Sequence, residues 1–291
     1  MQDKLFSLPV VKQITPYLSQ RQVGELPVII VSHPRVRAAV TLQGAHLIAW
    51  QPSGEKPVIW LSDKSPFLPG KAIRGGVPIC WPWFGPAGEP AHGFARNQSW
   101  TLSAHDENED GVLLTFVLES TPQTLKLWPH DFTLIARFRL GQHCEIELEA
   151  YGDYESTAAL HSYFNVADSA SVEVTGLGEH YIDKVKDNQP GQSEGKQRFT
   201  ERVDRIFTAP KDCSVINDLA GKRQIEVYHY HHSDVVTWNP GVALSCSMAD
   251  MPNEGYKTMV CVETARISKP LRSAGDKPAR LATTIRLKNK A

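Results

Sequence analysis

Short runs of β-branched and aromatic residues, separated by turn residues, are the feature that most restricts the fold of this chain. These runs occupy residues 28–31, 36–42, 112–118, 133–140, 144–151, 172–175, 224–230 and 234–238. In the stretch CEIELEA, Glu145, Glu147 and Glu149 alternate with Ile146 and Leu148, so we expect the acids on one side and the aliphatic residues on the other. This alternation predicts half-buried antiparallel strands.

Turn residues divide the runs at intervals typical of a sandwich or barrel. Gly and Pro, 20 of each, are joined by the polar segments 106–111, 187–195 and 239–241. No ten-residue helical pattern recurs between the runs, which argues against alternating strands and helices. We therefore predict an all-β fold, a large antiparallel sandwich in one domain over residues 1–291, with few short helices and an opening of some twenty residues that is partly helical.

Charge and cysteine content exclude several classes of protein. Lys and Arg total 31 and Asp and Glu 32, so no overall field attracts nucleic acid or an anionic membrane, and any recognition of an anion must be local. The N-terminal stretch does not fit a signal peptide, and no apolar run approaches the ~18 residues of a membrane helix. Five scattered cysteines without C-x-x-C argue against a disulfide framework. We expect a cytoplasmic protein that works as a monomer.

Three motifs that resemble known sites do not fit their structural context. Polar residues flank the G-x-S-x-G match at 191–195, which therefore cannot form a nucleophile elbow. In a strand, His229 and His231 would face one side and His232 the other, without a third ligand, so we predict no metal site. The stretch 176–178, GLG, lacks the third glycine of a dinucleotide site, and no cofactor is expected.

Two basic segments are candidates for binding an anion. If residues 92–96, HGFAR, form a strand, His92, Phe94 and Arg96 share one face. Arg74 precedes two glycines that would let a bulky anion approach the backbone. The forked guanidinium groups match phosphate oxygens.

Three strand-like segments place polar side chains among apolar ones. The stretch 159–166, ALHSYFNV, puts His161, Tyr163 and Asn165 on one strand face. The apolar stretch MVCVETA ends in Glu263, whose pKa burial should raise toward the value a general base needs. In the stretch 203–207, VDRIF, Asp204 and its neighbour arginine point to opposite faces.

Each of these residues alone has an ordinary structural explanation, because a strand histidine is usually packed and surface arginines usually form weak ion pairs. The aromatic and proline-rich loop 75–88 could stack on a ligand ring or close one end of the sheets. Taken together, a histidine that can donate a proton near neutrality, a buried carboxylate, a second carboxylate and two guanidiniums indicate proton transfer on a phosphorylated small molecule.

Six ordered motifs resemble those of the hexose-6-phosphate mutarotases, or glucose-6-phosphate 1-epimerases, and in particular the enterobacterial type. The motifs are AIRGGVPICWPWFG, AHGFARNQSW, LHSYFNV, VDRIF, DVVTWNP and CVETA, and the similarity runs from about residue 20 to 285. This family is related to aldose 1-epimerase. The resemblance implies a galactose-mutarotase-like β-sandwich and an isomerase that interconverts the α and β anomers of D-hexose 6-phosphates.

The resemblance also implies roles for individual residues. It makes His161 the general acid and Glu263 the general base, and it assigns Arg74 and Arg96 to the phosphate. Asp204 would bind sugar hydroxyls.

His92 would line the same site. Members of the family often carry glutamine before this histidine, whereas this chain has Ala91, so one polar contact to the substrate is missing or replaced.

Two other functions fit the same residues. A glycoside hydrolase needs two carboxylates, which Asp204 and Glu263 could supply, although the arginine motifs would then have no role. A sugar-phosphate-binding or sensing protein could use the same sandwich without catalysis, because a fold alone does not fix activity.

Overall fold

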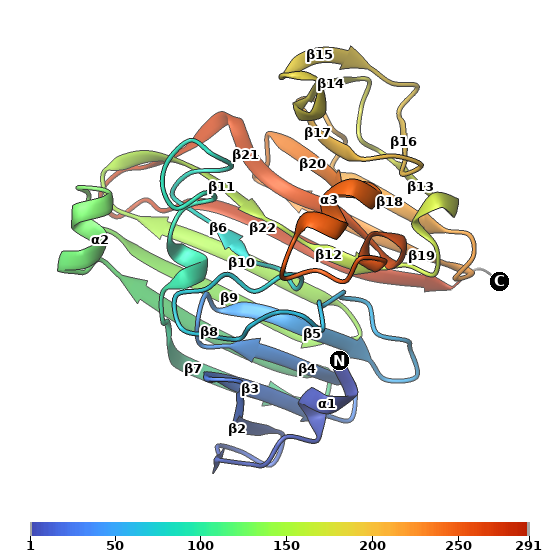
Figure 1. The fold of residues 1–291 in the computed structure, drawn as a ribbon. Coiled ribbons are helices and arrows are strands. Elements are labelled where there is room, and N and C mark those ends of the chain that lie inside the picture. The colour runs from blue at the N-terminus through green and yellow to red at the C-terminus, as the bar shows by residue number, and fades with distance from the viewer. Residues whose placement is uncertain (1, 290–291) are drawn as a thin grey trace.

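The computed structural model describes residues 2–289, and its strands form three sheets in which every strand pairing is antiparallel (Figure 1). The five-stranded sheet has the order β1 (Lys12–Gln13), β2 (Leu18–Val23), β3 (Leu26–His33), β4 (Val36–Thr41) and β5 (His46–Pro52). The nine-stranded sheet has the order β16 (Lys196–Arg198), β13 (Val172–Thr175), β18 (Cys213–Asp218), β19 (Arg223–Tyr230), β22 (Ala279–Asn289), β10 (Cys144–Tyr151), β9 (Thr133–Gly141), β8 (Gly111–Glu119) and β7 (Thr101–Asn108). The eight-stranded sheet has the order β15 (Gln189–Gln192), β14 (His180–Asp183), β17 (Val203–Phe207), β20 (Asp234–Asn239), β21 (Met259–Ser273), β11 (Tyr154–Leu160) and β6 (Ile79–Cys80), while β12 (Tyr163–Asn165) pairs with β21.

The sheets pack as two layers around one main core. Isolated bridges between Leu47 and Val77 and between Ile59 and Phe164 link the five-stranded and eight-stranded sheets along one layer. The nine-stranded sheet packs across them, with β22 against β21 and β8 against β3. Buried apolar side chains from all three sheets form one contiguous cluster. The predicted all-β class and sandwich architecture are confirmed.

All eight runs predicted from the sequence lie in or overlap strands. Alternation matches burial in β8, β9 and β19, whereas residues 28–31 are buried throughout. In β10, Ile146 and Leu148 are buried and Glu145 is exposed, as predicted. Glu149 is the exception, since only 2% of its surface is exposed. Arg137 and Arg280 donate to its carboxylate at 2.7 and 2.9 Å, which compensates for its burial.

Helices are short and lie at the edges of the sheets. The α-helices are α1 (Gln2–Phe6), α2 (Pro122–Leu127) and α3 (Gly241–Ser247), and the 3-10 helices are η1 (Ala95–Asn97), η2 (Ser169–Ser171), η3 (Lys184–Lys186) and η4 (Gly255–Thr258). The α1 helix confirms the partly helical opening. Among residues 2–289, no helix has both the length and the apolar character that crossing a bilayer requires.

Candidate active site

The site begins where the chain leaves β11 and enters β12. His161 and Ser162 interrupt the segment, so the prediction of one continuous strand over 159–166 is wrong. The interruption has a local cause, because the backbone N–H of Ser162 donates to the carbonyl of Leu160, two residues earlier, at 2.9 Å in a tight turn. His161 and Tyr163 nevertheless lie on the same side of the chain, with their rings stacked.

Glu263 lies within β21, which continues to Ser273, and therefore not at the end of an apolar strand as predicted. Its Oε1 atom lies 3.4 Å from Nε2 of His161. The side chains of Glu263 and His161 are 1% and 9% exposed. Oε2 of Glu263 and Nδ1 of His161 are buried and have no hydrogen-bond partner within the described structure. Two titratable groups thus face each other in an almost dry setting, with one unsatisfied atom each.

Burial sets the protonation of this pair. It raises the pKa of Glu263 well above its usual value, and the nearby charge of Asp204 raises it further, which agrees with the prediction for this residue. Burial likewise lowers the pKa of His161, with smaller contributions from His92, Arg96 and Arg74. Both shifts favour the neutral forms of the two side chains, and His161 is less ready to donate near neutrality than its usual pKa suggests.

Arg74 lies beside Tyr163 at the edge of this pair. Its Nε and Nη2 atoms each lie 3.1 Å from Oδ2 of Asp250, and Nη1 donates to the Tyr163 hydroxyl at 3.1 Å. Ser65 fixes its backbone, because the Ser65 hydroxyl accepts from Arg74 N–H at 2.8 Å. The guanidinium is held in place, and Asp250 offsets part of its charge.

The two glycines after Arg74 serve packing and do not open space for a ligand. Both have positive φ, 107° at Gly75 and 70° at Gly76. A Cβ atom would come within 2.6 Å of the Trp60 carbonyl at Gly75 and 2.4 Å of His46 Nε2 at Gly76. The expectation that these glycines admit an anion to the backbone is therefore wrong, since protein atoms already occupy both positions.

The HGFAR segment is a turn followed by η1, so the prediction of a strand at 92–96 is wrong. His92 and Gly93 both adopt positive φ, at 66° and 72°. Phe94 enters the main core, while the charge of Arg96 is close enough to His92 to lower the pKa of that imidazole. His92 and Arg96 are thus neighbours, whereas Phe94 faces away from them.

The turn places His92 next to the general acid candidate. The rings of His92 and His161 lie 5.6 Å apart. Arg96 donates from Nη2 to the backbone carbonyl of Ala91 at 2.9 Å, a contact that does not depend on the side chain at position 91. The buried Nε of Arg96 has no partner within residues 2–289.

Asp204 faces the site from β17, as the VDRIF pattern predicts. It pairs in register with Trp238 of β20, which pairs with Cys261 two residues before Glu263. Burial raises the pKa of Asp204 to about 6, while Lys184 and Arg202 lower it. The neighbouring Arg205 forms its contacts away from the site.

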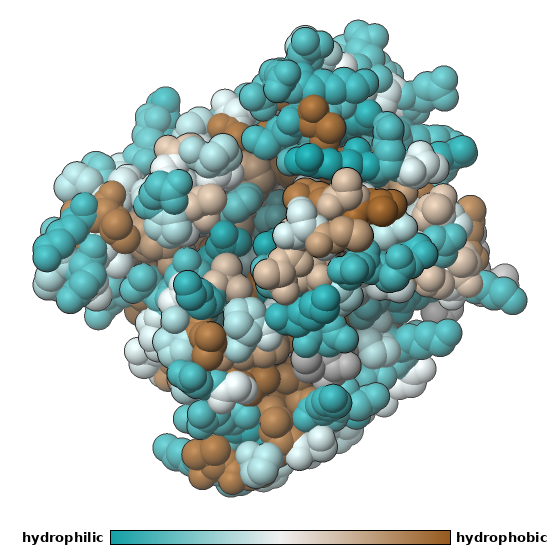
Figure 2. All heavy atoms as spheres, in the orientation of Figure 1, coloured by the Kyte–Doolittle hydropathy of each residue, from teal (hydrophilic) through white to brown (hydrophobic). Residues whose placement is uncertain are grey.

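Part of loop 75–88 builds the core and part borders the site. Trp81 is fully buried, with its ring 4.7 Å from that of Phe132, so it closes one end of the sandwich. Phe84 contacts the His92 ring edge-on at 4.9 Å. Figure 2 shows a recess at the centre of the face on which Figure 1 places β6, β11 and β21.

The other histidine-rich segment has a structural role. β19 ends at Tyr230 and His231 has positive φ, so His229 faces His232 at 5.3 Å, and the predicted pairing of His229 with His231 is wrong. His229 is buried between hydroxyl groups of Thr264 and Ser214, at 2.7 and 3.0 Å.

Potential metal ligands in His161, Cys261 and Glu263 lie within 4.8 Å of one another. Burial raises the pKa of Cys261 and of Glu263, which disfavours the anionic forms that bind a metal. This group therefore suits proton transfer better than metal binding.

Comparison with known proteins agrees with this geometry. The profile of the family described as aldose 1-epimerase matches residues 27–278. The chain belongs to the aldose 1-epimerase family. Proteins provisionally named glucose-6-phosphate 1-epimerase from Salmonella typhimurium strain LT2 and Escherichia coli strain K12 are each 57% identical to this chain, over 98% and 99% of both sequences. A crystal structure of a provisionally assigned mutarotase from Salmonella typhimurium, 56% identical, superimposes with a TM-score of 0.98 over all of both chains.

Sequence reasoning missed several residues of this aldose 1-epimerase family site. Asp250 fixes Arg74 from a position 176 residues away, and no local pattern marks it. Tyr163 was placed on the correct face, but its contact with Arg74 was not foreseen. Lys184 follows Asp183, which caps η3, and an Asp before a short helical turn is a sequence signal that could have located this residue.

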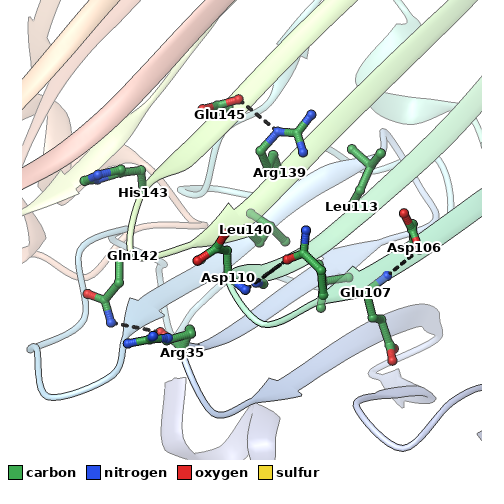
Figure 3. Close-up of a pocket in the computed structure, with 14 residues that line it drawn as sticks. Arg35, Asp106, Glu107, Asp110, Leu113, Arg139, Leu140, Gln142, His143 and Glu145 are labelled. Carbon is green, nitrogen blue, oxygen red and sulfur yellow. Dashed lines mark hydrogen bonds and ion pairs between the residues drawn. The ribbon is translucent and has the colours of Figure 1, made fainter.

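A cavity of about 460 Å³ lies away from the candidate active site, at the turns that join β7 to β8 and β9 to β10 (Figure 3). Its charged lining includes Asp106, Asp110 and the Arg139–Glu145 ion pair at 3.2 Å. It contains none of the predicted site residues. We do not place the active site there.

Proposed function

We propose that this protein interconverts the α and β anomers of D-hexose 6-phosphates, with glucose 6-phosphate as the preferred substrate, by acid–base opening and closure of the sugar ring. His161 and Glu263 are the general acid and base. Arg74 and Arg96 bind the phosphate, Asp204 binds sugar hydroxyls, and His92 lines the site. One domain over residues 1–291 provides every group.

The 3.4 Å separation of His161 Nε2 and Glu263 Oε1 is the observation that most supports this proposal. In a pyranose, the C1 hydroxyl and the ring oxygen are bonded to the same carbon, so an acid and a base that act on both must be adjacent. A carboxylate pair is not required, because the ring oxygen that leaves C1 stays in the same molecule and no external nucleophile replaces it. The His161 imidazole and the Glu263 carboxylate are adjacent, so both can act on one C1 centre.

In the proposed ring opening, Glu263 accepts the proton of the C1 hydroxyl and His161 donates a proton to the ring oxygen. The C1–O5 bond breaks as the C1 carbonyl forms. Rotation about C1–C2 presents the other carbonyl face, and the two residues exchange roles to close the ring. The proton count of the pair is the same before and after the cycle, so the reaction needs no cofactor.

The phosphate has a second effect through the arginines. Arg96 and Arg74 both lower the pKa of His161 in the unliganded protein, after the larger effect of burial. A phosphate dianion between them offsets their charge and raises the pKa of His161. Binding of the phosphorylated sugar therefore moves the pair toward imidazolium and carboxylate, the state in which His161 can act as the acid.

The printed names of the close relatives, glucose-6-phosphate 1-epimerase and mutarotase, support the proposal. We further propose a cytoplasmic enzyme that works as a monomer. All five cysteines are free thiols, which suits a reducing compartment.

The rate of anomer exchange of glucose 6-phosphate, measured by magnetisation transfer between the two anomeric protons, tests the proposal. We expect the protein to accelerate exchange and to leave aryl glycosides intact. Release of the aryl group would favour a glycoside hydrolase that uses Asp204 and Glu263. Saturable binding of hexose phosphates without faster exchange would favour a non-catalytic binding protein.

A further inference from the structure

A lysine that the proposed mechanism does not use lies at the edge of the site. Lys184 begins η3, directly after β14, and its side chain is partly buried. A Cβ atom placed on Gly85 would lie 3.9 Å from Lys184 Nζ. Two hydrogen bonds join Gly85 and His92. The backbone N–H of His92 donates to the Gly85 carbonyl at 2.7 Å, and the backbone N–H of Gly85 donates to Nδ1 of His92 at 3.3 Å. The ammonium group therefore lies over the turn that holds His92.

Lys184 lies near Asp204. β14 ends at Asp183, which pairs with Arg205, and η3, which begins at Lys184, packs against β17. The charge of Lys184 lowers the pKa of Asp204 against the larger effect of burial. At His92, burial lowers the pKa to about 3, with further lowering by Arg96, Arg74 and Lys184. Three cations thus converge on one imidazole from different segments.

The neighbouring residues fix the position of this lysine. Oδ1 of Asp183 accepts from the backbone N–H of Val185 at 3.1 Å and so caps η3. Arg205 Nε donates to Oδ2 of the same aspartate at 3.2 Å, and the Arg205 guanidinium lies 4.3 Å from the centre of the Tyr181 ring. Asp183 is 5% exposed, so the pair is held in a protected position.

The ammonium of Lys184 has no hydrogen bond or ion pair within residues 2–289, although its charge acts on Asp204. A partly buried cation without a partner, next to the turn that holds His92, is suited to a ligand anion. We propose that Lys184 is a third cation of the substrate site, which binds the phosphate of a hexose 6-phosphate together with Arg74 and Arg96 and sets the preference for phosphorylated over free hexoses. This inference rests on the proposed function.

Binding measurements separate this role from catalysis. Calorimetric titration with glucose 6-phosphate and with inorganic phosphate is compared for wild type, Lys184→Gln, Lys184→Arg and Lys186→Gln. Loss of one charge-assisted contact predicts about tenfold weaker binding of both anions by Lys184→Gln. Lys184→Arg should stay within about threefold of wild type, because it keeps the charge. Lys186 is exposed in the same turn, so Lys186→Gln should change binding by less than about twofold, as expected for a screened surface charge.

Exchange rates provide the second readout. Lys184→Gln should raise KM for glucose 6-phosphate by about tenfold and change exchange of free glucose by much less, which narrows the preference between the two sugars. Unchanged binding of both anions by Lys184→Gln would overturn the proposal, and so would an equal loss for phosphorylated and free sugar, which would indicate a structural role. If the wild type binds glucose 6-phosphate without speeding exchange, the proposed function fails, while the binding comparison still decides the role of Lys184.

Discussion

The imidazole of His161 lies parallel to the phenol ring of Tyr163, with the ring centroids 4.8 Å apart and the planes 10° apart. This stacking fixes the plane of the imidazole and directs Nε2 toward Glu263. The hydroxyl group of the same tyrosine accepts from Arg74 at 3.1 Å. One side chain therefore orients the proposed acid through its ring and a proposed phosphate ligand through its hydroxyl group.

Two substitutions at Tyr163 separate these roles. Tyr163→Phe keeps the ring but removes the acceptor for Arg74, so we expect kcat to hold while KM for glucose 6-phosphate rises by about two- to tenfold, the range of one hydrogen bond. Tyr163→Leu also removes the stack and should lower kcat by about tenfold or more. Steady-state exchange kinetics check both values, and an equal fall of kcat in the two variants would contradict the division of roles.

Arg74 forms an ion pair with Asp250, so substitution of Arg74 and substitution of Arg96 should have different consequences. Either Arg74→Ala or Arg96→Ala should weaken use of glucose 6-phosphate by about 1.5 kcal/mol or more, the low end for a charge-assisted hydrogen bond, and narrow its advantage over free glucose. Arg74→Ala also leaves the Asp250 carboxylate without its partner near the incoming phosphate. The double variant Arg74→Ala/Asp250→Asn should therefore recover part of the loss. Full preference for the phosphorylated sugar in both single variants would refute the phosphate assignment.

The raised pKa of Asp204 predicts a dependence of stability on pH. Burial raises this pKa to about 6, from an unfolded value of 3.8. Between these two pH values the folded state binds more protons than the unfolded state, so the contribution of Asp204 is fully present below pH 3.8 and is lost as pH rises through 6. Relative to wild type, Asp204→Asn should become more stable over this range, by at most about 3 kcal/mol. Denaturant unfolding of both proteins from pH 4 to pH 8 measures the difference between their free energies of unfolding. A difference that stays constant over this range would contradict the prediction.

Inorganic phosphate provides a test of the coupling between the arginines and His161. Bound phosphate should raise the pKa of His161, because it offsets the charges of Arg96 and Arg74 that lower it after burial. The chemical shift of the His161 ring followed against pH, with and without phosphate, measures this change. The Arg96→Ala variant should show a smaller phosphate-dependent shift. If phosphate leaves the titration of His161 in the wild type unchanged, bound phosphate does not act on the proposed acid. That result would contradict the coupling.

The sequence predicts the strands well because alternation is a local property. The runs at β8, β9 and β19 match the alternating burial of their own strands. Prediction fails where the chain leaves the sheet ladder. Positive φ at His92 converts HGFAR into a turn, and the tight turn in which Ser162 N–H donates to the Leu160 carbonyl separates β11 from β12. The periodicity of apolar residues does not reveal such turns.

The composition of the site could be predicted, but its energetics could not. Residue types and motif resemblance point to His161, Glu263 and Asp204, and the fold brings all three to one region. The contacts of Arg74 with Asp250 and of His161 with Tyr163 depend on how distant strands meet. The low pKa of His161 also depends on this arrangement, because burial is its main cause. Sequence alone could not assign these effects.

The most direct test measures α-to-β exchange of glucose 6-phosphate for wild type, Glu263→Gln and His161→Ala, with circular dichroism to verify folding. A general acid or base contributes about 10²- to 10⁴-fold, so each variant should lose at least about 100-fold in exchange rate while it remains folded. Exchange at the wild-type rate in either folded variant would contradict the assignment of His161 and Glu263 as the acid–base pair.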